Sequence, residues 1–157
     1  MTLPLLPDAL RGALWQADQL ACAPQPGEPS GHAALDAELP GGGWPRGTLT
    51  ELLLDGPGRG ELRLLAPLLA RLGHAGRAVV WIDPPCRPHG PALAAWGLNL
   101  SRLLWVHTES THRGHAQDAL WAAEQALDAR CGAVLCWTDE SAPRQRQGLD
   151  TALRRLH

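Results

Sequence analysis

One glycine-rich turn carries the residues whose types and spacing come closest to a known chemistry, the binding of a nucleotide phosphate. It reads Asp55-Gly56-Pro57-Gly58-Arg59-Gly60-Glu61-Leu62. A working phosphate loop has the pattern G-x-x-x-x-G-K-[ST], in which backbone N–H groups and the lysine hold the phosphates. Here the loop is one residue shorter, Glu61 stands in the lysine position and Leu62 stands in the position of the metal-binding hydroxyl. We therefore expect a degenerate loop, formed by Gly56, Gly58, Arg59, Gly60 and Glu61, that binds no cofactor.

The composition removes other chemistries as well. All 14 basic residues are arginines, and the aromatic residues are seven tryptophans with no tyrosine or phenylalanine. The chain therefore has no lysine for a Schiff base or a phosphate and no tyrosine acid. Arg59 could meet a phosphate as a free cation, but Glu61 would repel it at close range. An ATP-binding ATPase is consequently the weakest alternative, and we expect no catalytic residues.

Two pairs of cysteine and histidine residues have the ligand types that zinc prefers. Cys86 and His89 follow one predicted strand, and His112 and His115 follow the next. Loops that leave parallel strands converge at the carboxyl edge of a sheet, so the four side chains could meet there. The mixed spacing is not a zinc signature and His107 competes for the same place. We interpret these residues as solvated loop histidines and expect no metal.

The elements that must position these residues alternate regularly along the chain. The predicted strands are 48–54, 78–82, 103–107 and 133–137, and the predicted helices are 61–72, 91–96, 115–129 and 144–156. Such alternation, with almost continuous apolar strands, predicts an α/β fold in which a parallel sheet carries helices on both faces. Since no strand follows the helix 144–156, we expect the last strand of the sheet to be missing from a shortened chain.

The chain divides into two parts by composition. Residues 1–29 combine a helix-like stretch at 8–21 with three prolines, which predicts an N-terminal helical arm and a proline-rich linker. Residues 30–157 form the predicted α/β domain. The net charge of −2 and the isoelectric point near 6.4 give no overall attraction to nucleic acid. The longest apolar run is too short for a membrane span, and four cysteines without a C-x-x-C pair suit a reduced cytoplasm.

A few large or charged side chains are candidates for partner contacts. Trp44 lies in a Gly/Pro-rich turn, where it either caps the sheet or anchors a partner. By contrast, Trp81, Trp121 and Trp137 lie within predicted elements and are expected in the core. The basic cluster consists of Arg144, Arg146, Arg154 and Arg155. It is interpreted as a solvated helix face, with partner or DNA contact as alternatives.

Several segments resemble RecA-like proteins. The stretch Ser30-Gly31-His32-Ala33-Ala34-Leu35-Asp36 and the Thr50-Glu51-Leu52 that precedes the turn are similar to the part of RecA before its nucleotide loop. The block Leu39-Pro40-Gly41-Gly42-Gly43-Trp44-Pro45, followed by the lysine-less turn, resembles the ImuA family, RecA-like accessory proteins of a damage-inducible mutagenesis cassette. Residues 61–81 also resemble SulA, the cell-division inhibitor that shares this degenerate fold. The resemblance spans about residues 30–157.

The resemblance implies a protein-binding role. RecA-like enzymes carry a catalytic glutamate two residues after the aspartate of the second strand, where this chain has Pro85, and Asp139 stands one residue late for a metal-supporting aspartate. Similarity to ImuA implies a non-catalytic accessory factor of translesion DNA synthesis, located in the cytoplasm at the nucleoid. Its partners would be an ImuB-type polymerase homologue, RecA and a DnaE-type polymerase, with DNA contacted indirectly. The alternative is a SulA-like inhibitor of the division GTPase FtsZ.

The same resemblance leads to an expectation about the sheet. Strand 48–54 would lie beside 133–137, followed by 103–107 and then 78–82. Without a fifth strand, the apolar residues 49–54 would form an open edge. An open edge invites pairing, so we expect the N-terminal arm, a partner strand or self-association with a second copy to cover it.

Overall fold

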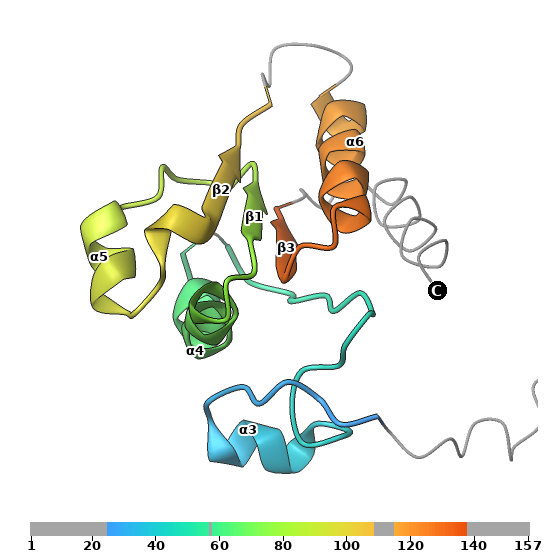
Figure 1. Cartoon of the computed structure of the whole chain (residues 1–157), viewed down its shortest axis with the longest axis vertical. Helices are drawn as coiled ribbons and strands as arrows, with labels where there is room; N and C mark the ends of the chain where they lie inside the picture. Colours follow the sequence, from blue (N-terminus) through green and yellow to red (C-terminus); the bar gives the residue numbers. More distant parts are fainter. Residues whose placement is uncertain (1–24, 57, 109–114, 138–157) are drawn as a thin grey trace, which may run out of the picture.

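The computed structural model describes residues 25–56, 58–108 and 115–137 (Figure 1). Within them lies a parallel sheet of β1 (Val79–Ile82), β2 (Leu103–Val106) and β3 (Ala133–Cys136). The other elements are α3 (Ala33–Glu38), α4 (Glu61–His74), α5 (Gly90–Ala95), the 3-10 helix η1 (Leu100–Arg102) and α6 (His115–Asp128). The predicted α/β fold with a parallel sheet is confirmed. No helix of these residues is long and apolar enough to cross a membrane.

The order of the strands differs from the expectation. The sheet runs β2-β1-β3, so the strand after α4 is central and 103–106 lies at one side of it, not between 79–82 and 133–136. The reason lies in the helices. The connection through α5 uses one face of the sheet and the connection through α6 uses the other (Figure 1). Right-handed crossovers on opposite faces carry the chain in opposite directions, so β2 and β3 pair with β1 from its two sides.

Alternate side chains of β1 build two cores. Val79 and Trp81 face α4 and α5, whereas Val80 and Ile82 face α6. All four are buried, which is the pattern of a strand covered on both faces. Helices therefore cover both faces, as predicted. On the α6 side, small residues at helical spacing let the helix approach the sheet closely; they are Ala119, Ala123 and Ala126.

The predicted strand 48–54 is not formed. These residues belong to no strand, and Leu53 has 80% of its surface exposed. A strand gains its hydrogen bonds from a neighbour, and in the described part of the chain no strand pairs with this segment. The expected edge made by 49–54 is therefore absent from the described sheet. Whether a further strand exists beyond β3 falls outside the described residues, as do the predicted helices 8–21 and 144–156.

Helix α4 continues without a break past a proline in its interior. It begins at Glu61, as predicted, and contains Pro67 in its interior. Pro67 is in contact with the segment before α3, because a Cβ placed on Gly31 would lie 2.4 Å from the Pro67 Cβ. Gly31 also has a φ of +86°, which favours glycine. The proline thus packs the turn that precedes α3 against α4.

The segment around α3 is held together by polar contacts. The backbone N–H of Ser30 donates a hydrogen bond to Asp36 (2.7 Å), and hydrogen bonding to Ser30 lowers the pKa of Asp36. The Arg71 guanidinium of α4 donates to the Pro29 carbonyl. Glu28 and Trp44 form an isolated antiparallel bridge. Residues 25–29 therefore contact the segment that follows them, and the proposed domain boundary at residue 29 stays a prediction.

Of the tryptophans expected in the core, one is fully buried and another is mostly exposed. Trp81 is fully buried and meets Trp137 edge-on, with ring centroids 5.8 Å apart. Trp121 was expected to be buried as well, but 64% of it is exposed. The small residues of α6 occupy the face toward the sheet, so position 121 lies on the outer face of the helix.

Candidate functional site

The glycine-rich turn ends in a helix N-terminus that is closed by its own carboxylate. Gly60 caps α4 with φ +107°, a conformation that favours glycine, and its carbonyl accepts from the Leu64 N–H at 2.9 Å. The Gly58 N–H donates to Glu61 Oε1 at 3.3 Å. Glu61 is only 7% exposed. The carboxylate is thus turned back onto the Gly58 N–H, one of the loop donors that a phosphate would otherwise use.

This geometry has a simple electrostatic consequence. Backbone N–H groups and the positive end of a helix dipole attract one negative group to this place. In this chain that group is Glu61 itself. Its second oxygen, Oε2, is buried and has no hydrogen-bond partner among the described residues. A phosphate at the same position would have to displace a carboxylate and would meet its charge at close range.

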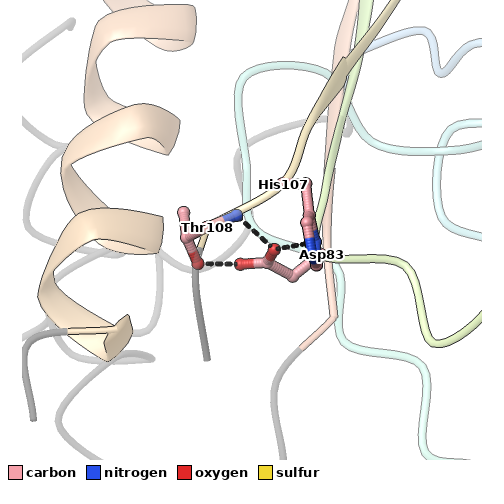
Figure 2. A network of polar contacts seen from close by, with 3 residues as sticks. All are labelled: Asp83, His107 and Thr108. Carbon is pink, nitrogen blue, oxygen red and sulfur yellow. Dashed lines mark hydrogen bonds and ion pairs between the residues drawn. The ribbon is translucent and has the colours of Figure 1, made fainter. Parts of the chain in front are cut away.

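A polar cluster lies where β1 and β2 end, and Figure 2 shows its three members. The register places Ile82 opposite Val106, so Asp83 and His107 follow at the same edge. Asp83 Oδ1 accepts from the Thr108 backbone N–H (2.7 Å), and Asp83 Oδ2 lies 2.5 Å from Thr108 Oγ1. His107 Nδ1 is 3.4 Å from Asp83 Oδ1. The carboxylate therefore ties the ends of two neighbouring strands together.

Asp83 has an unusual backbone. Its φ is +48°, in the left-handed region that asparagine and aspartate tolerate better than most residues. Its N–H still donates to the Val106 carbonyl at 3.0 Å. The chain leaves β1 in this strained conformation and continues directly into two prolines. Asp83 therefore fixes the direction of the loop 84–89 as well as the end of β2.

A surface pocket opens beside this cluster. It is lined by Pro84, Pro85, Cys86, Arg87, Trp105 and His107. The Arg87 guanidinium lies 5.8 Å from the centroid of the Trp105 ring, within the range of a cation–π contact. The Trp105 and His107 rings are 6.0 Å apart. The pocket thus joins an aromatic face to two basic groups at the carboxyl edge of the sheet, where ligands of open parallel sheets bind.

The comparisons with known proteins bear on this arrangement of loop and sheet. No protein-family model and no curated protein matches the chain. A solved structure does match: SulA from Pseudomonas aeruginosa, with 28% sequence identity and a TM-score of 0.54, over 71% of this chain and 92% of that one. The chain has a SulA-like fold. The sequence resemblance to SulA is confirmed at the level of the fold.

The other residues that the sequence predicted for the site lie in different environments. Trp44 is 7% exposed, so a partner would reach its ring only if the residues around it moved. Its partner role stays a prediction. The four basic residues Arg144, Arg146, Arg154 and Arg155 lie outside the described residues. Gly56, Gly58, Arg59, Gly60 and Glu61 do form one turn at the start of α4.

The four cysteine and histidine residues that were weighed as zinc ligands, with no metal expected, are only partly described. Cys86 lies on the rim of the pocket and His89 caps α5, where its Nδ1 accepts from the Ala92 N–H at 3.3 Å. His112 and the His115 side chain fall outside the description. Among the described residues no three histidine, cysteine or acidic side chains gather in a way that would hold a metal ion.

Cys136, at the end of β3, supplies a prediction about alkaline pH. Burial, together with the nearby charge of Asp83, raises the pKa of the Cys136 thiol from about 9 to about 11. The folded protein therefore holds this proton more tightly than the unfolded chain. The stabilisation is fully present below pH 9 and is lost as the pH rises to about 11. We expect the free energy of unfolding to fall by about 1 to 2 kcal/mol over this window.

Urea denaturation at pH 8 and pH 10.5 measures this loss. The amino-acid composition reduces the number of other side chains that titrate between these two pH values. Because the chain contains no lysine and no tyrosine, side chains of these types do not titrate in the same window. The control is Cys136→Ala, in which the decline should become shallower. The exposed Cys86 is a matched site, since Cys86→Ala should leave the decline unchanged. An equal decline in wild type and Cys136→Ala would contradict the assignment.

Proposed function

We propose that this protein is a non-catalytic accessory factor that acts by binding other proteins in damage-induced translesion DNA synthesis. Its partners would be an ImuB-type polymerase homologue, RecA and a DnaE-type polymerase, and it would act at the nucleoid and reach DNA through them. The observation that carries the proposal is the buried carboxylate of Glu61, which is hydrogen-bonded across the turn where an ATPase of related fold holds phosphate.

Two further features support a binding role. The SulA-like fold is shared with a solved chain that aligns over 92% of its own length at 28% identity, which favours a regulatory protein over an unrelated enzyme. The tri-glycine block that resembles ImuA forms the tight turn that carries Trp44. Gly41 and Gly42 both have positive φ, and Gly43 lies too close to Glu28 to accept a side chain. The glycines of the block are therefore required by the backbone conformation of this turn.

Co-purification tests the proposal. The tagged full chain serves as bait in extracts of cells treated with a DNA-damaging agent, and the tag alone serves as the control. We expect capture of the ImuB-type partner or RecA, identified by mass spectrometry. Capture of neither would remove the main support for the accessory role.

The second candidate function, inhibition of FtsZ, is favoured by the structural likeness to SulA. It predicts filamentous cells when the chain is overexpressed in a strain without the mutagenesis cassette. It also predicts that the purified chain lowers GTP hydrolysis by FtsZ. Normal cell length together with unchanged hydrolysis would reject this candidate and leave the accessory role in place.

Isothermal titration with Mg-ATP addresses the ATPase alternative. We expect no binding heat for the wild-type chain. Glu61→Gln separates charge from shape, because it removes the negative charge and keeps the size of the side chain. Micromolar binding by the wild type would overturn the proposal. Binding that appears only in Glu61→Gln would identify the carboxylate as the group that excludes the nucleotide.

A further inference from the structure

Strand β2 is a sheet edge with apolar side chains left in solvent. Within the described residues it pairs with β1 on one side and with no strand on the other. Leu104 is 54% exposed and Trp105 is 42% exposed. An edge strand presents a row of backbone N–H and C=O groups, and exposed apolar residues on it mark a place where another strand can add.

The two exposed side chains lie on opposite faces of the sheet. Leu104 is in register with Val80, which faces α6, and Trp105 is in register with Trp81, which faces α4. Neither helix extends far enough to cover β2 fully. A segment added along β2 would therefore place alternate side chains next to Leu104 on one face and next to Trp105 on the other.

The Trp105 face is basic. Arg87 stands over the Trp105 ring, and His107 follows on the same side of the strand. Arg87 makes no ion pair with a described residue, and the same holds for the exposed Arg102, the last residue of η1, which adds a second positive charge next to the β2 edge. The nearby carboxylate of Asp83 is mostly buried and is engaged with Thr108 and His107. Charge complementarity consequently favours an acidic occupant.

We propose that the outer edge of β2, together with the pocket of Arg87, Trp105 and His107, binds an extended acidic segment of a partner protein by strand addition. The site also sets the pattern of that segment. Apolar residues would lie on the Leu104 face, and alternating acidic residues would meet Arg87 and His107 beside the Trp105 ring on the other. The inference rests on the proposed function in that it assumes a protein partner, and it names the surface that receives it.

A second copy of this chain fits the edge less well. An antiparallel pairing of two β2 strands, centred between Leu104 and Trp105, would place Arg102 of one copy opposite His107 of the other. It would also bring the arginines of both copies to one edge without acidic side chains to match them. The same basic edge therefore favours a partner of opposite charge.

The test uses fluorescence anisotropy with the full chain and a labelled eight-residue peptide of alternating valine and glutamate. We expect saturable binding that weakens at least tenfold in Arg87→Glu and severalfold in Trp105→Ala. Matched controls are Arg63→Glu on exposed α4 surface and Trp121→Ala on the outer face of α6, neither of which should change binding. A peptide with a central proline, which cannot complete the hydrogen-bond ladder, should also bind at least tenfold more weakly.

Several results would overturn the proposal. They are no binding of the acidic peptide, equal binding of a valine–lysine peptide, equal effects of the site and control variants, and tighter binding of a twelve-residue oligodeoxythymidine. A dimer in light scattering that Trp105→Ala dissociates would assign the edge to a second copy instead. Circular dichroism confirms that each variant is folded. The readout is independent of co-purification, so failure of the proposed function and failure of this site are distinguishable.

Discussion

Replacing Trp81 by alanine is expected to lower the free energy of unfolding by about 3 to 5 kcal/mol, the range for truncating a large buried aromatic side chain. Trp81 is fully buried in the central strand, between α4 and the edge of the Trp137 ring. The truncation leaves a cavity on the face of β1 that a rigid strand and helix cannot close. Since small domains are stable by about 5 to 15 kcal/mol, this one change removes a large part of the total.

Urea denaturation followed by far-ultraviolet circular dichroism measures this effect. Trp121→Ala is the matched control, because the same atoms are removed from a side chain that is mostly in solvent. We expect it to change stability by no more than about 0.5 kcal/mol. Trp81→Phe should fall between them, since the indole N–H of Trp81 has no partner among the described residues and its loss carries no hydrogen-bond cost. Similar losses for Trp81→Ala and Trp121→Ala would contradict this account of the core.

The sequence predicted most of the described elements because their patterns are local. The leucines of 61–72 recur at helical spacing, and the apolar runs at 78–82, 103–107 and 133–137 are bounded by turns. These features correspond to α4, β1, β2 and β3 within one or two residues. Residues 48–54 have a similar apolar character but form no strand. A run of apolar residues indicates that a segment can pair, whereas pairing itself depends on a neighbour.

The strand order could not be read from these patterns for a related reason. It depends on which face of the sheet each connecting helix covers. The connecting helices are α5 and α6. Helix α5 brings Leu93 to the face of Val79 and Trp81, and α6 brings alanines to the face of Val80 and Ile82. Each helix has apolar residues that could pack on either face, so neither pattern alone assigns one. A resemblance to RecA-like proteins supplied an order, and the register of the sheet corrected it.

In the candidate site, too, the part that depends on a local motif was predicted and the part that depends on strand pairing was missed. Glu61 was identified from sequence because its meaning depends on a motif of consecutive residues. The contact between Asp83 and Thr108 joins residues 25 positions apart, and it exists only because β1 and β2 pair in a particular register. The pocket was also missed, since Arg87 meets Trp105 across that strand pair. The available signal was weak: polar residues that follow adjacent parallel strands tend to converge.

Removing the Asp83 carboxylate should also lower the free energy of unfolding by a large amount. Asp83→Ala deletes both acceptors for Thr108, which is itself buried, and leaves a side chain that tolerates φ +48° poorly. We expect a loss of about 2 to 4 kcal/mol, from a hydrogen bond to a charged group together with the left-handed backbone cost. Asp83→Asn should lose the least, because its carbonyl still accepts from the Thr108 N–H and asparagine tolerates this backbone. Asp83→Gly should lie between them, since glycine relieves the backbone and supplies no acceptor.

The order of these three variants distinguishes the two causes, and Cys136 adds a second readout. If the backbone strain dominated, Asp83→Gly would be the most stable of the three. If the hydrogen bonds dominate, Asp83→Asn is. Because the Asp83 charge contributes to the raised pKa of the Cys136 thiol, Asp83→Asn should also lower that pKa. Alkylation of Cys136 near pH 9 should then be faster than in the wild-type protein. Equal stability of the alanine and asparagine variants, with unchanged alkylation, would mean that the carboxylate neither joins the ends of β1 and β2 nor acts on the neighbouring thiol.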